Sequence, residues 1–480
     1  MFPFQWRIKG YEDKLFSEQI SLNNIDYAIN SNWERQVEPE GDFDTNCLYN
    51  EKNYFFEFVH DALYDNGKTN SLIHHFERKE PQHDEVYYVI DCGHKKYELK
   101  VYAINLNLYS TGVGLLSFYL YNEKYPAPAD VLNINQAGRR VFPPFIASVN
   151  RRGILAESIE IQGLHGRPYG YKEDFCRYTN KNSPNDPAGF IVDIINEIAR
   201  NIIIKPVVDD RMFVQCWYKN DEWAREFKND YTQFLYSNPW YEYVFVDDLN
   251  GISCKNEEMQ ARLIKEATYE RWQEEGSLYA ISRYSMVFLT NDNAPDFLFD
   301  NFETMYARMA ELILVQKSSV LRFSAEVTNI SNMDVEKHFS EKVSSLYREY
   351  IRFVNQIHFR EVSAQDQGIE LYQKLYKVMN IEKHVEKLDD EISELHNYVS
   401  LREDQKRSST VSLLTWIATI AVPLTMIAGF FGMNNIDFDV DEQKEPIVWY
   451  NHLSNQLLTA FVVTGVIFFI VLIIKNRRNK

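Results

Sequence analysis

Two long stretches near the C-terminus of the sequence contain no charged side chain. The first lies between Arg407 and Asp437, and the second lies between Leu453 and Ile474. About 20 consecutive apolar residues suffice for a helix to cross a bilayer. The alternative is a pair of buried core helices, but such helices rarely run this long without a charge. The pattern therefore predicts two transmembrane helices, at residues 411–434 and 453–475, joined by a loop at 435–452.

A heptad pattern of apolar residues precedes the first stretch. Its positions step by four and three residues, with charged residues between them: Ile381, Val385, Leu388, Ile392, Leu395, Val399 and Arg402. Such spacing is typical of a helix that packs along one face. We expect one continuous helix from about Gly368 into the first span, on the order of 90 Å long at 1.5 Å per residue. Residues 368–410 would form a stalk that either transmits movement or acts as a passive spacer.

Further helices are predicted in the region 285–367. One side of the helix nearest the stalk is apolar, at Phe339, Val343, Leu346, Tyr350, Phe353, Val354 and Ile357. The segment from Leu298 to Val327 is expected to form an amphipathic helix or a pair of helices. The cytosolic region therefore ends in a set of helices that leads into the stalk.

The N-terminal region, residues 1–284, has the pattern of an α+β domain. Segments 85–92, 97–109 and 112–122 are rich in β-branched and aromatic residues, and Ser110, Thr111 and Gly112 fit a turn between the last two. A helix is predicted from Pro187 to Arg200, with Asp186 as its N-cap. The predicted fold is an α+β cytosolic domain followed by long stalk helices and two transmembrane helices.

Composition narrows the classes of function. A chain of 480 residues with 45% apolar content is expected to contain several domains. Its net charge of -18 repels a polyanion, so we expect no extended nucleic-acid surface. The five cysteines are widely spaced, and neither a disulfide framework nor a zinc site is indicated. The adjacent His74 and His75 are expected to be surface or turn residues. The sequence contains no arrangement typical of a catalytic site, so we expect no enzyme.

Basic residues flank both predicted spans on the same side. Arg402, Lys406 and Arg407 precede the first span, and the tail at 476–480 is basic. This distribution places both chain ends in the cytosol. The loop would then lie outside, where its carboxylates form either a rim that concentrates cations or an ordinary solvated loop. Those carboxylates belong to Asp437, Asp439, Asp441, Glu442 and Glu445.

Small and apolar residues of the first span recur at helical spacing. They are Val411, Leu414, Ala418, Val422, Thr425 and Gly429. Two helices per chain cannot enclose a water-filled path, so conduction requires several copies around an axis. The stripe then either lines a path that conducts when it is wetted, or mediates close helix packing. Spacing alone leaves both interpretations open.

The first span resembles the first membrane helix of CorA magnesium transporters. It contains the run from Pro423 to Gly429 and ends in the Gly-Met-Asn signature of that family at Gly432, Met433 and Asn434. A short loop and a second terminal span follow, and the resemblance covers residues 285–480. The chain departs from the family at Phe431 and Asn435, where Tyr and Phe are usual.

The resemblance implies a funnel-shaped homopentamer that transports Mg²⁺ or another divalent cation. Asn434 side chains would form a ring at the outer pore mouth and bind the hydrated ion through their amide oxygens. The alternative role for Asn434 is that of a helix cap. Gly432, Met433 and Asn434 would form the selectivity filter. Residues Leu414, Val422, Thr425 and Gly429 would line the pore, with the first two as its constriction.

A ligand-sensing role is predicted for the N-terminal region. Four arginines lie within fourteen residues, at Arg139, Arg140, Arg151 and Arg152. Guanidinium groups suit phosphates or carboxylates, although salt bridges and turns are the alternative roles. The enlarged region is similar to that of CorA-like membrane proteins that accompany type III CRISPR systems. This resemblance implies an alternative function, in which a nucleotide second messenger gates an antiviral effector in the inner membrane of a prokaryote.

Overall fold

The computed structural model describes most of the chain N-terminal to residue 433. The described residues are 1–10, 32–37, 51–68, 70–83, 85–141, 156–165, 171–175, 187–198, 202–208, 211–247, 252–332, 339–432, 460 and 464–465. The chain divides into two compact units, Met1–Glu394 and Leu395–Lys480. The domain boundaries expected from the sequence stay predictions.

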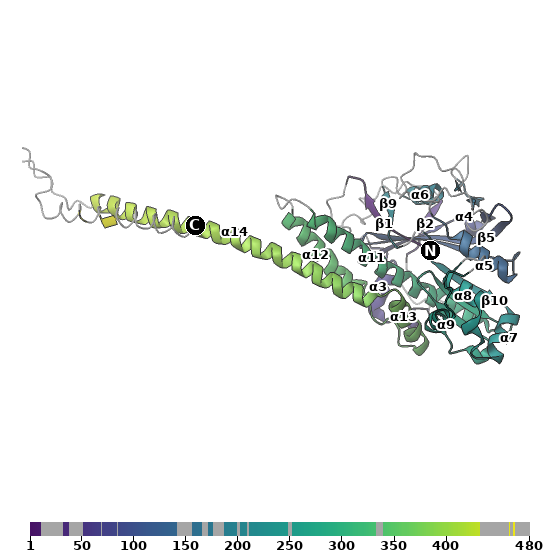
Figure 1. Cartoon of the computed structure of the whole chain (residues 1–480). Helices are drawn as coiled ribbons and strands as arrows, with labels where there is room; N and C mark the ends of the chain where they lie inside the picture. Colours follow the sequence, from purple (N-terminus) through teal and green to yellow (C-terminus); the bar gives the residue numbers. More distant parts are fainter. Residues whose placement is uncertain are drawn as a thin grey trace, which may run out of the picture. The chain divides into compact units, whose positions relative to one another are not determined.

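The first unit contains a nine-stranded antiparallel sheet, counted over the described residues (Figure 1). The long strand β5 is its centre, because β6 pairs along one edge while β4 and β3 pair with successive parts of the other edge. The predicted strands at 85–122 and the turn at Gly112 are confirmed. The strands are β1 Phe2–Ile8, β2 Trp33–Arg35, β3 Ile73–Arg78, β4 Val86–Asp91, β5 Lys96–Tyr109, β6 Val113–Tyr121, β7 Ser158–Gln162, β8 Tyr171–Asp174 and β9 Ile202–Pro206.

A second, four-stranded sheet has its own core. Its order is β10-β13-β12-β11, and β10 runs parallel to β13 although 65 residues of chain separate their ends in the sequence, from Lys219 to Ser285. Trp240 is fully buried there and its indole donates a hydrogen bond to the Thr268 hydroxyl at 3.1 Å. The elements are β10 Val214–Lys219, α7 Asp221–Asn229, α8 Asn238–Phe245, α9 Glu257–Ala267, β11 Thr268–Tyr269, β12 Leu278–Ile281 and β13 Ser285–Thr290.

Short helices complete the first unit. Three of them are one turn of 3-10 helix, at Glu57–Val59, Gln233–Tyr236 and Gln273–Glu275. Helices α5 and α6 contribute to the core of the large sheet. The remaining helices of this part are α3 His60–Leu63, α4 Glu80–His83, α5 Pro128–Gly138 and α6 Gly189–Asn196.

Helix α6 begins two residues later than predicted. Ala188 is its N-cap, and Pro187 lies before the helix, while Asp186 lies outside the described residues. The carboxylate of Glu173 accepts a hydrogen bond from the Gly189 backbone N–H at 2.7 Å. A side chain from β8 therefore satisfies a donor that a local cap was expected to satisfy, which sequence spacing cannot reveal.

Helix α11 (Ala307–Ser331) lies at the centre of the helical layer. It follows α10 (Asp296–Asn301) through one turn of π-helix at Phe302–Tyr306. It packs on β1 and β6 of the large sheet and on α12 and α13, so it is buried on nearly all sides rather than amphipathic (Figure 1). The buried Gln316 amide donates hydrogen bonds to the Ile357 carbonyl at 3.0 Å and the Tyr372 hydroxyl at 2.9 Å. These bonds fix the connection between α12 and α13 on α11.

The predicted apolar face of α12 (Phe339–Gln356) is confirmed, because Phe339, Val343, Leu346, Tyr350 and Phe353 are buried. The predicted continuous helix from Gly368 is wrong. Helix α13 (Asp366–Val378) ends before Asn380, and α14 begins at Ile381. Asn380 has a φ of 54°, a left-handed conformation that ends a helix and that asparagine tolerates better than most residues.

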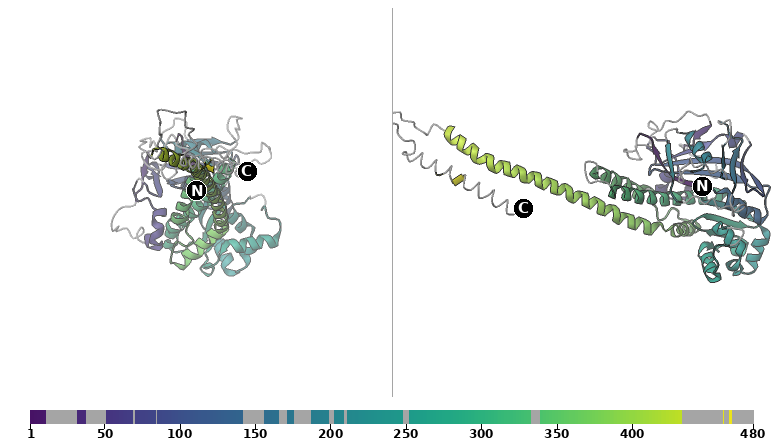
Figure 2. Two further views of the ribbon diagram at one scale, coloured as in Figure 1. Left: turned by 90° about the vertical axis from the view of Figure 1, so that its left-hand side faces the viewer. Right: turned by 45° about the horizontal axis from the view of Figure 1, so that its top comes forward.

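Helix α14 (Ile381–Gly432) contains 52 residues and is unbroken (Figure 2). At 1.5 Å per residue it is about 78 Å long. Its first turns belong to the compact unit Met1–Glu394, where Ile381, Leu388 and Ile392 are at most 1% exposed. The beginning of the predicted heptad seam is therefore buried within a single chain.

A buried ionic network joins α11 to α12. The Arg322 guanidinium is fully buried and contacts Glu326 at 2.8 Å and Glu349 at 3.1 Å. Glu326 also lies 3.8 Å from Arg7, which is about one-third exposed. Charges removed from water require well-placed partners, whereas a partly exposed pair contributes little.

We expect Arg322→Met to destabilise the protein by about 3 kcal/mol, because it leaves the Glu349 carboxylate buried without this partner. Arg7→Met is the matched control, since it also faces Glu326, and should cost under about 1 kcal/mol. Denaturant unfolding of the full-length protein, followed by tryptophan fluorescence, measures both changes. Equal effects of the two substitutions would show that burial does not determine the strength of this network.

Candidate functional site

The C-terminal half of α14 presents apolar side chains to its surroundings. Val411, Leu414 and Val422 are between 54% and 61% exposed. Leu413, Ile417, Leu424 and Met426 are exposed to a similar extent. Keeping this set of side chains in water costs on the order of 10 kcal/mol relative to burying it. By length and composition α14 can cross a membrane, and it is the one such helix found among the described residues.

The six predicted stripe residues share one side of this helix. Because residues 411–429 are helical throughout, a rotation of 100° per residue places the six within about 80° of one another. By the same geometry Leu413, Leu424 and Ile417 lie outside the stripe, at about 140°, 120° and 100° from its centre. Exposure does not distinguish the two sides, so the pore-lining role of Val411, Leu414, Ala418, Val422, Thr425 and Gly429 stays a prediction.

The polar groups of this segment are largely satisfied within the helix. The hydroxyls of Thr415, Thr419 and Thr425 donate to backbone carbonyls four residues earlier, at 2.7 to 3.0 Å. Pro423 lies inside the helix and has no N–H, so the Thr419 carbonyl loses its usual helical donor. In a membrane this carbonyl requires water or a neighbouring helix as a partner. The segment can therefore enter a bilayer and still carries one polar backbone group.

The predicted filter lies at the end of α14. Gly432 is the last residue of the helix, and Met433 and Asn434 lie outside the described residues. The predicted acidic rim, from Asp437 to Glu445, also lies outside them, as does most of the second predicted span. The roles proposed for these residues stay predictions.

The two described arginines of the predicted anion site are both buried. Arg139 caps α5 and donates to the Gln136 side chain at 3.0 Å and to the Val246 carbonyl at 2.9 Å. Arg140 donates to the Ala156 carbonyl and stacks on the Phe175 ring at 4.4 Å. Arg151 and Arg152 lie outside the described residues. The contacts seen here are those of packing arginines, and a ligand role for the four stays a prediction.

The prediction that His74 and His75 are surface or turn residues is wrong. They lie on β3, where His74 is fully buried and His75 contacts the Asn107 side chain. Burial and the charge of Arg308 lower the pKa of His75 to about 4, so its ring is neutral at pH 7. Among the described residues no group of three or more His, Cys, Asp or Glu side chains is arranged to hold a metal.

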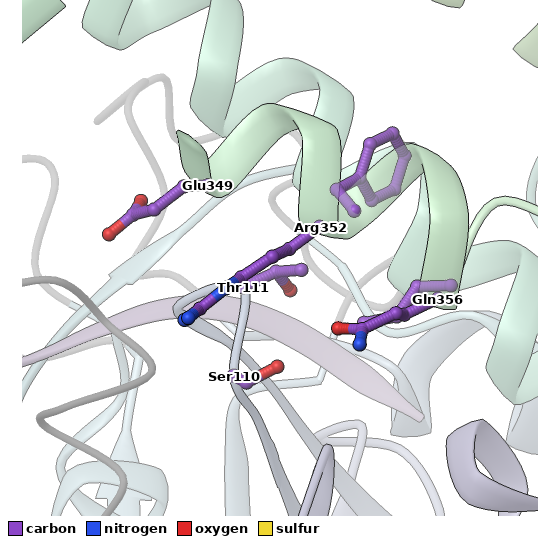
Figure 3. Close-up of a pocket in the computed structure, with 7 residues that line it drawn as sticks. Ser110, Thr111, Glu349, Arg352 and Gln356 are labelled. Carbon is purple, nitrogen blue, oxygen red and sulfur yellow. The ribbon is translucent and has the colours of Figure 1, made fainter. Parts of the chain in front are cut away.

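A small hollow lies where α12 meets the β5–β6 turn. Figure 3 shows Arg352 extending from α12 toward Ser110 and Thr111, with Gln356 on the next turn of the helix. The internal volume is about 10 Å³, enough for one water molecule. The sequence predicts both the turn and the helix, but it contains no local signal that brings them together.

Comparison with known proteins finds one family model that matches the C-terminal part of the chain. The model of the CorA-like Mg²⁺ transporter protein family matches residues 289–474. The matched region begins within β13 and includes α10 to α14. No curated protein matches the chain.

We expect Ile417→Arg to prevent insertion of the apolar segment, because arginine at the centre of a membrane helix costs about 2.5–3.5 kcal/mol. A cysteine in place of Gln443, in the predicted outer loop, reports insertion through its labelling by an impermeant maleimide in intact cells. Labelling should fall at least severalfold in the Ile417→Arg variant.

Leu401→Arg is the control, because Leu401 is 65% exposed on the same helix but lies before the apolar segment. Its labelling should equal that of the parent. Failure of the parent to label, or equal labelling of both arginine variants, would contradict the predicted span and its orientation.

Proposed function

We propose that the chain forms an oligomeric channel for Mg²⁺ or a similar divalent cation, gated by its cytosolic unit, because residues 289–474 match the model of the CorA-like Mg²⁺ transporter protein family. The chain would then be a membrane-embedded homo-oligomer that transports divalent cations, and not an enzyme. Five copies would surround the path, as the resemblance of the first span implies. Both chain ends would face the cytosol.

The observation that carries this proposal is the continuity of α14. Its first turns are buried in the compact unit Met1–Glu394, and the same helix continues without a break into the exposed apolar segment. A rigid helix transmits a displacement along its whole length. A change in how the first turns pack would therefore move the apolar stripe, provided that a ligand binds one of the two arrangements more tightly.

Leu414 and Val422 are proposed to form the gate. A narrow apolar ring excludes water and therefore ions, and it conducts once it is wide enough to be wetted. Thr425 and Gly429 follow on the same stripe, toward Gly432. The stripe thus leads from an apolar constriction toward the proposed filter.

Asn434 is proposed to select the ion. Mg²⁺ sheds its hydration water reluctantly, so a neutral amide that hydrogen-bonds the hydrated ion recognises it without removing that shell. The acidic residues from Asp437 to Glu445 would raise the cation concentration at the mouth. Together these groups would hold a divalent cation without a fixed cage of protein ligands.

We expect Leu414→Asn to raise the resting Mg²⁺ flux of the protein in liposomes by at least about tenfold, because a polar side chain in every subunit favours a wetted gate. Leu413→Asn is the matched control, since Leu413 is similarly exposed but lies outside the stripe, about 140° from its centre. A Mg²⁺-sensitive dye inside the liposomes measures the flux. An increase of the same size in Leu413→Asn would refute the assignment of the gate to one face.

We expect Asn434→Ala to abolish the preference for Mg²⁺ over monovalent cations, because the alanine ring offers the hydrated ion no amide oxygen. Asn435→Ala tests whether the neighbouring amide has the same effect and should retain the preference. Flux of Mg²⁺ and K⁺ under identical gradients measures the ratio. An unchanged ratio in Asn434→Ala would exclude this residue as the filter.

A further inference from the structure

Two basic side chains from distant parts of the sequence meet at the start of α14, and the charge of a third acts on both. Lys317 of α11 has its ammonium nitrogen 3.1 Å from Nε2 of His384 on the second turn of α14. Arg283, in the turn between β12 and β13, lies close enough to act electrostatically on both. We call Arg283, Lys317 and His384 the basic cluster. All three belong to the compact unit Met1–Glu394.

The field at the basic cluster is positive. Burial, followed by the charge of Arg283, lowers the pKa of Lys317. Burial, followed by the charges of Lys317, Arg283 and Lys387, lowers the pKa of His384. Every charge that acts on these two groups is a cation. The neutral His384 ring therefore accepts a hydrogen bond from the Lys317 ammonium.

The carboxylates of α14 near this point face other groups. Glu382 lies 3.9 Å from Arg360, Asp389 acts on Tyr350 of α12, and Glu386 acts on Tyr376 of α13. In the described part of the chain, neither Arg283 nor Lys317 forms an ion pair with a carboxylate. For the half-buried Lys317 this arrangement differs from the usual one, in which charges taken out of water are paired. In a chain of net charge -18, a positive site of this kind is a specific feature.

The number and type of the cations indicate the ligand. Arg283 and Lys317 together carry two positive charges when His384 is neutral, so a single carboxylate would leave one of them uncompensated. A phosphate group carries close to two negative charges at neutral pH and presents three acceptor oxygens. A guanidinium, an ammonium and an imidazole supply donors for all three.

We propose that the basic cluster binds a phosphate group, either as inorganic phosphate or as part of a nucleotide, and thereby ties the start of α14 to α11 and to the second sheet. This site goes beyond the proposed transport function, and its binding can be measured without any ion flux. The bound anion would replace the direct contact between Lys317 and His384 with contacts that bridge both. It would also connect the β12–β13 turn to the base of the long helix.

Thermal unfolding of the full-length protein in detergent tests the site. Inorganic phosphate should raise the unfolding midpoint in a saturable manner, and chloride at the same ionic strength should not. Arg283→Gln should weaken phosphate binding at least about tenfold, because one charge-assisted contact is lost. Arg283 is exposed, so this variant is expected to fold. Lys317→Met should weaken binding to at least the same extent.

Arg360→Gln is the matched control. Arg360 is also exposed and lies near the first turn of α14, but it faces Glu382 rather than the basic cluster. This variant should bind phosphate like the parent. Equal stabilisation by chloride and phosphate, or parental affinity in Arg283→Gln, would overturn the proposal.

Sulfate provides a pH test, because its charge does not change between pH 6 and 8. The charged groups that act on His384 are Lys317 of α11, Arg283 of the turn and Lys387 of α14. A bound dianion favours the protonated ring, so sulfate should bind more tightly as the pH falls, and His384→Gln should remove this dependence. A pH dependence that persists in His384→Gln would contradict the assignment of His384.

A comparison of inorganic phosphate with a nucleoside triphosphate identifies the source of the group. Tighter binding of the nucleotide, lost in Arg283→Gln, would assign the site to nucleotides, and equal affinities would assign it to phosphate alone. If neither ligand shifts the unfolding midpoint, the cluster does not bind phosphate and the proposal is wrong.

Discussion

The apolar segment of α14 is poorly compatible with water, and the proposed function depends on that constraint. Side chains on all sides of residues 411–426 are exposed, and their transfer out of water is worth on the order of 10 kcal/mol. The same helix begins among fully buried contacts in the compact unit Met1–Glu394. One continuous helix therefore begins within a compact domain and ends in a segment that can cross a bilayer. The continuity of α14 is therefore central to the proposed function.

Several interactions of the compact unit Met1–Glu394 lie close to the beginning of α14. Helix α11 packs on the large sheet, and Gln316 fixes the α12–α13 connection on it. The left-handed Asn380 then separates α13 from α14, so the two are distinct helices. The contact between Lys317 and His384 also attaches the start of α14 to α11. A ligand that strengthens or weakens these attachments acts directly on the helix that carries the proposed gate.

Local patterns predicted much of the fold. The strands β4, β5 and β6, the turn at Gly112 and the apolar face of α12 follow from side-chain periodicity and turn chemistry, which depend on neighbouring residues. The break at Asn380 was missed, because the apolar spacing continues on both sides of it and one left-handed residue leaves no periodic signal. The start of α6 was misplaced because its cap comes from Glu173 on β8.

For the candidate sites, too, features that depend on neighbouring residues were predicted, and features that depend on distant contacts were not. The stripe on α14 was predicted because helical spacing is a local property. The burial of Arg139, Arg140 and His74 was not, because it depends on strands and helices that pack on them from elsewhere in the chain. Arg283, Lys317 and His384 come from three elements and form no sequence motif. Only the packing of α11, the β12–β13 turn and α14 brings them together.

The most direct measurement of the central claim is the accessibility of single cysteines along α14 in the reconstituted oligomer. Each of residues 411–429 would be replaced by cysteine in a background without native thiols, and its reaction rate with a small water-soluble reagent would be compared with and without Mg²⁺. The proposed mechanism predicts fast, ion-dependent reaction on the face of Leu414, Val422 and Gly429, and slow reaction on the face of Leu413 and Leu424, about 120° to 140° from the centre of the stripe. Fast reaction on the second face, or uniform rates around the helix, would contradict it.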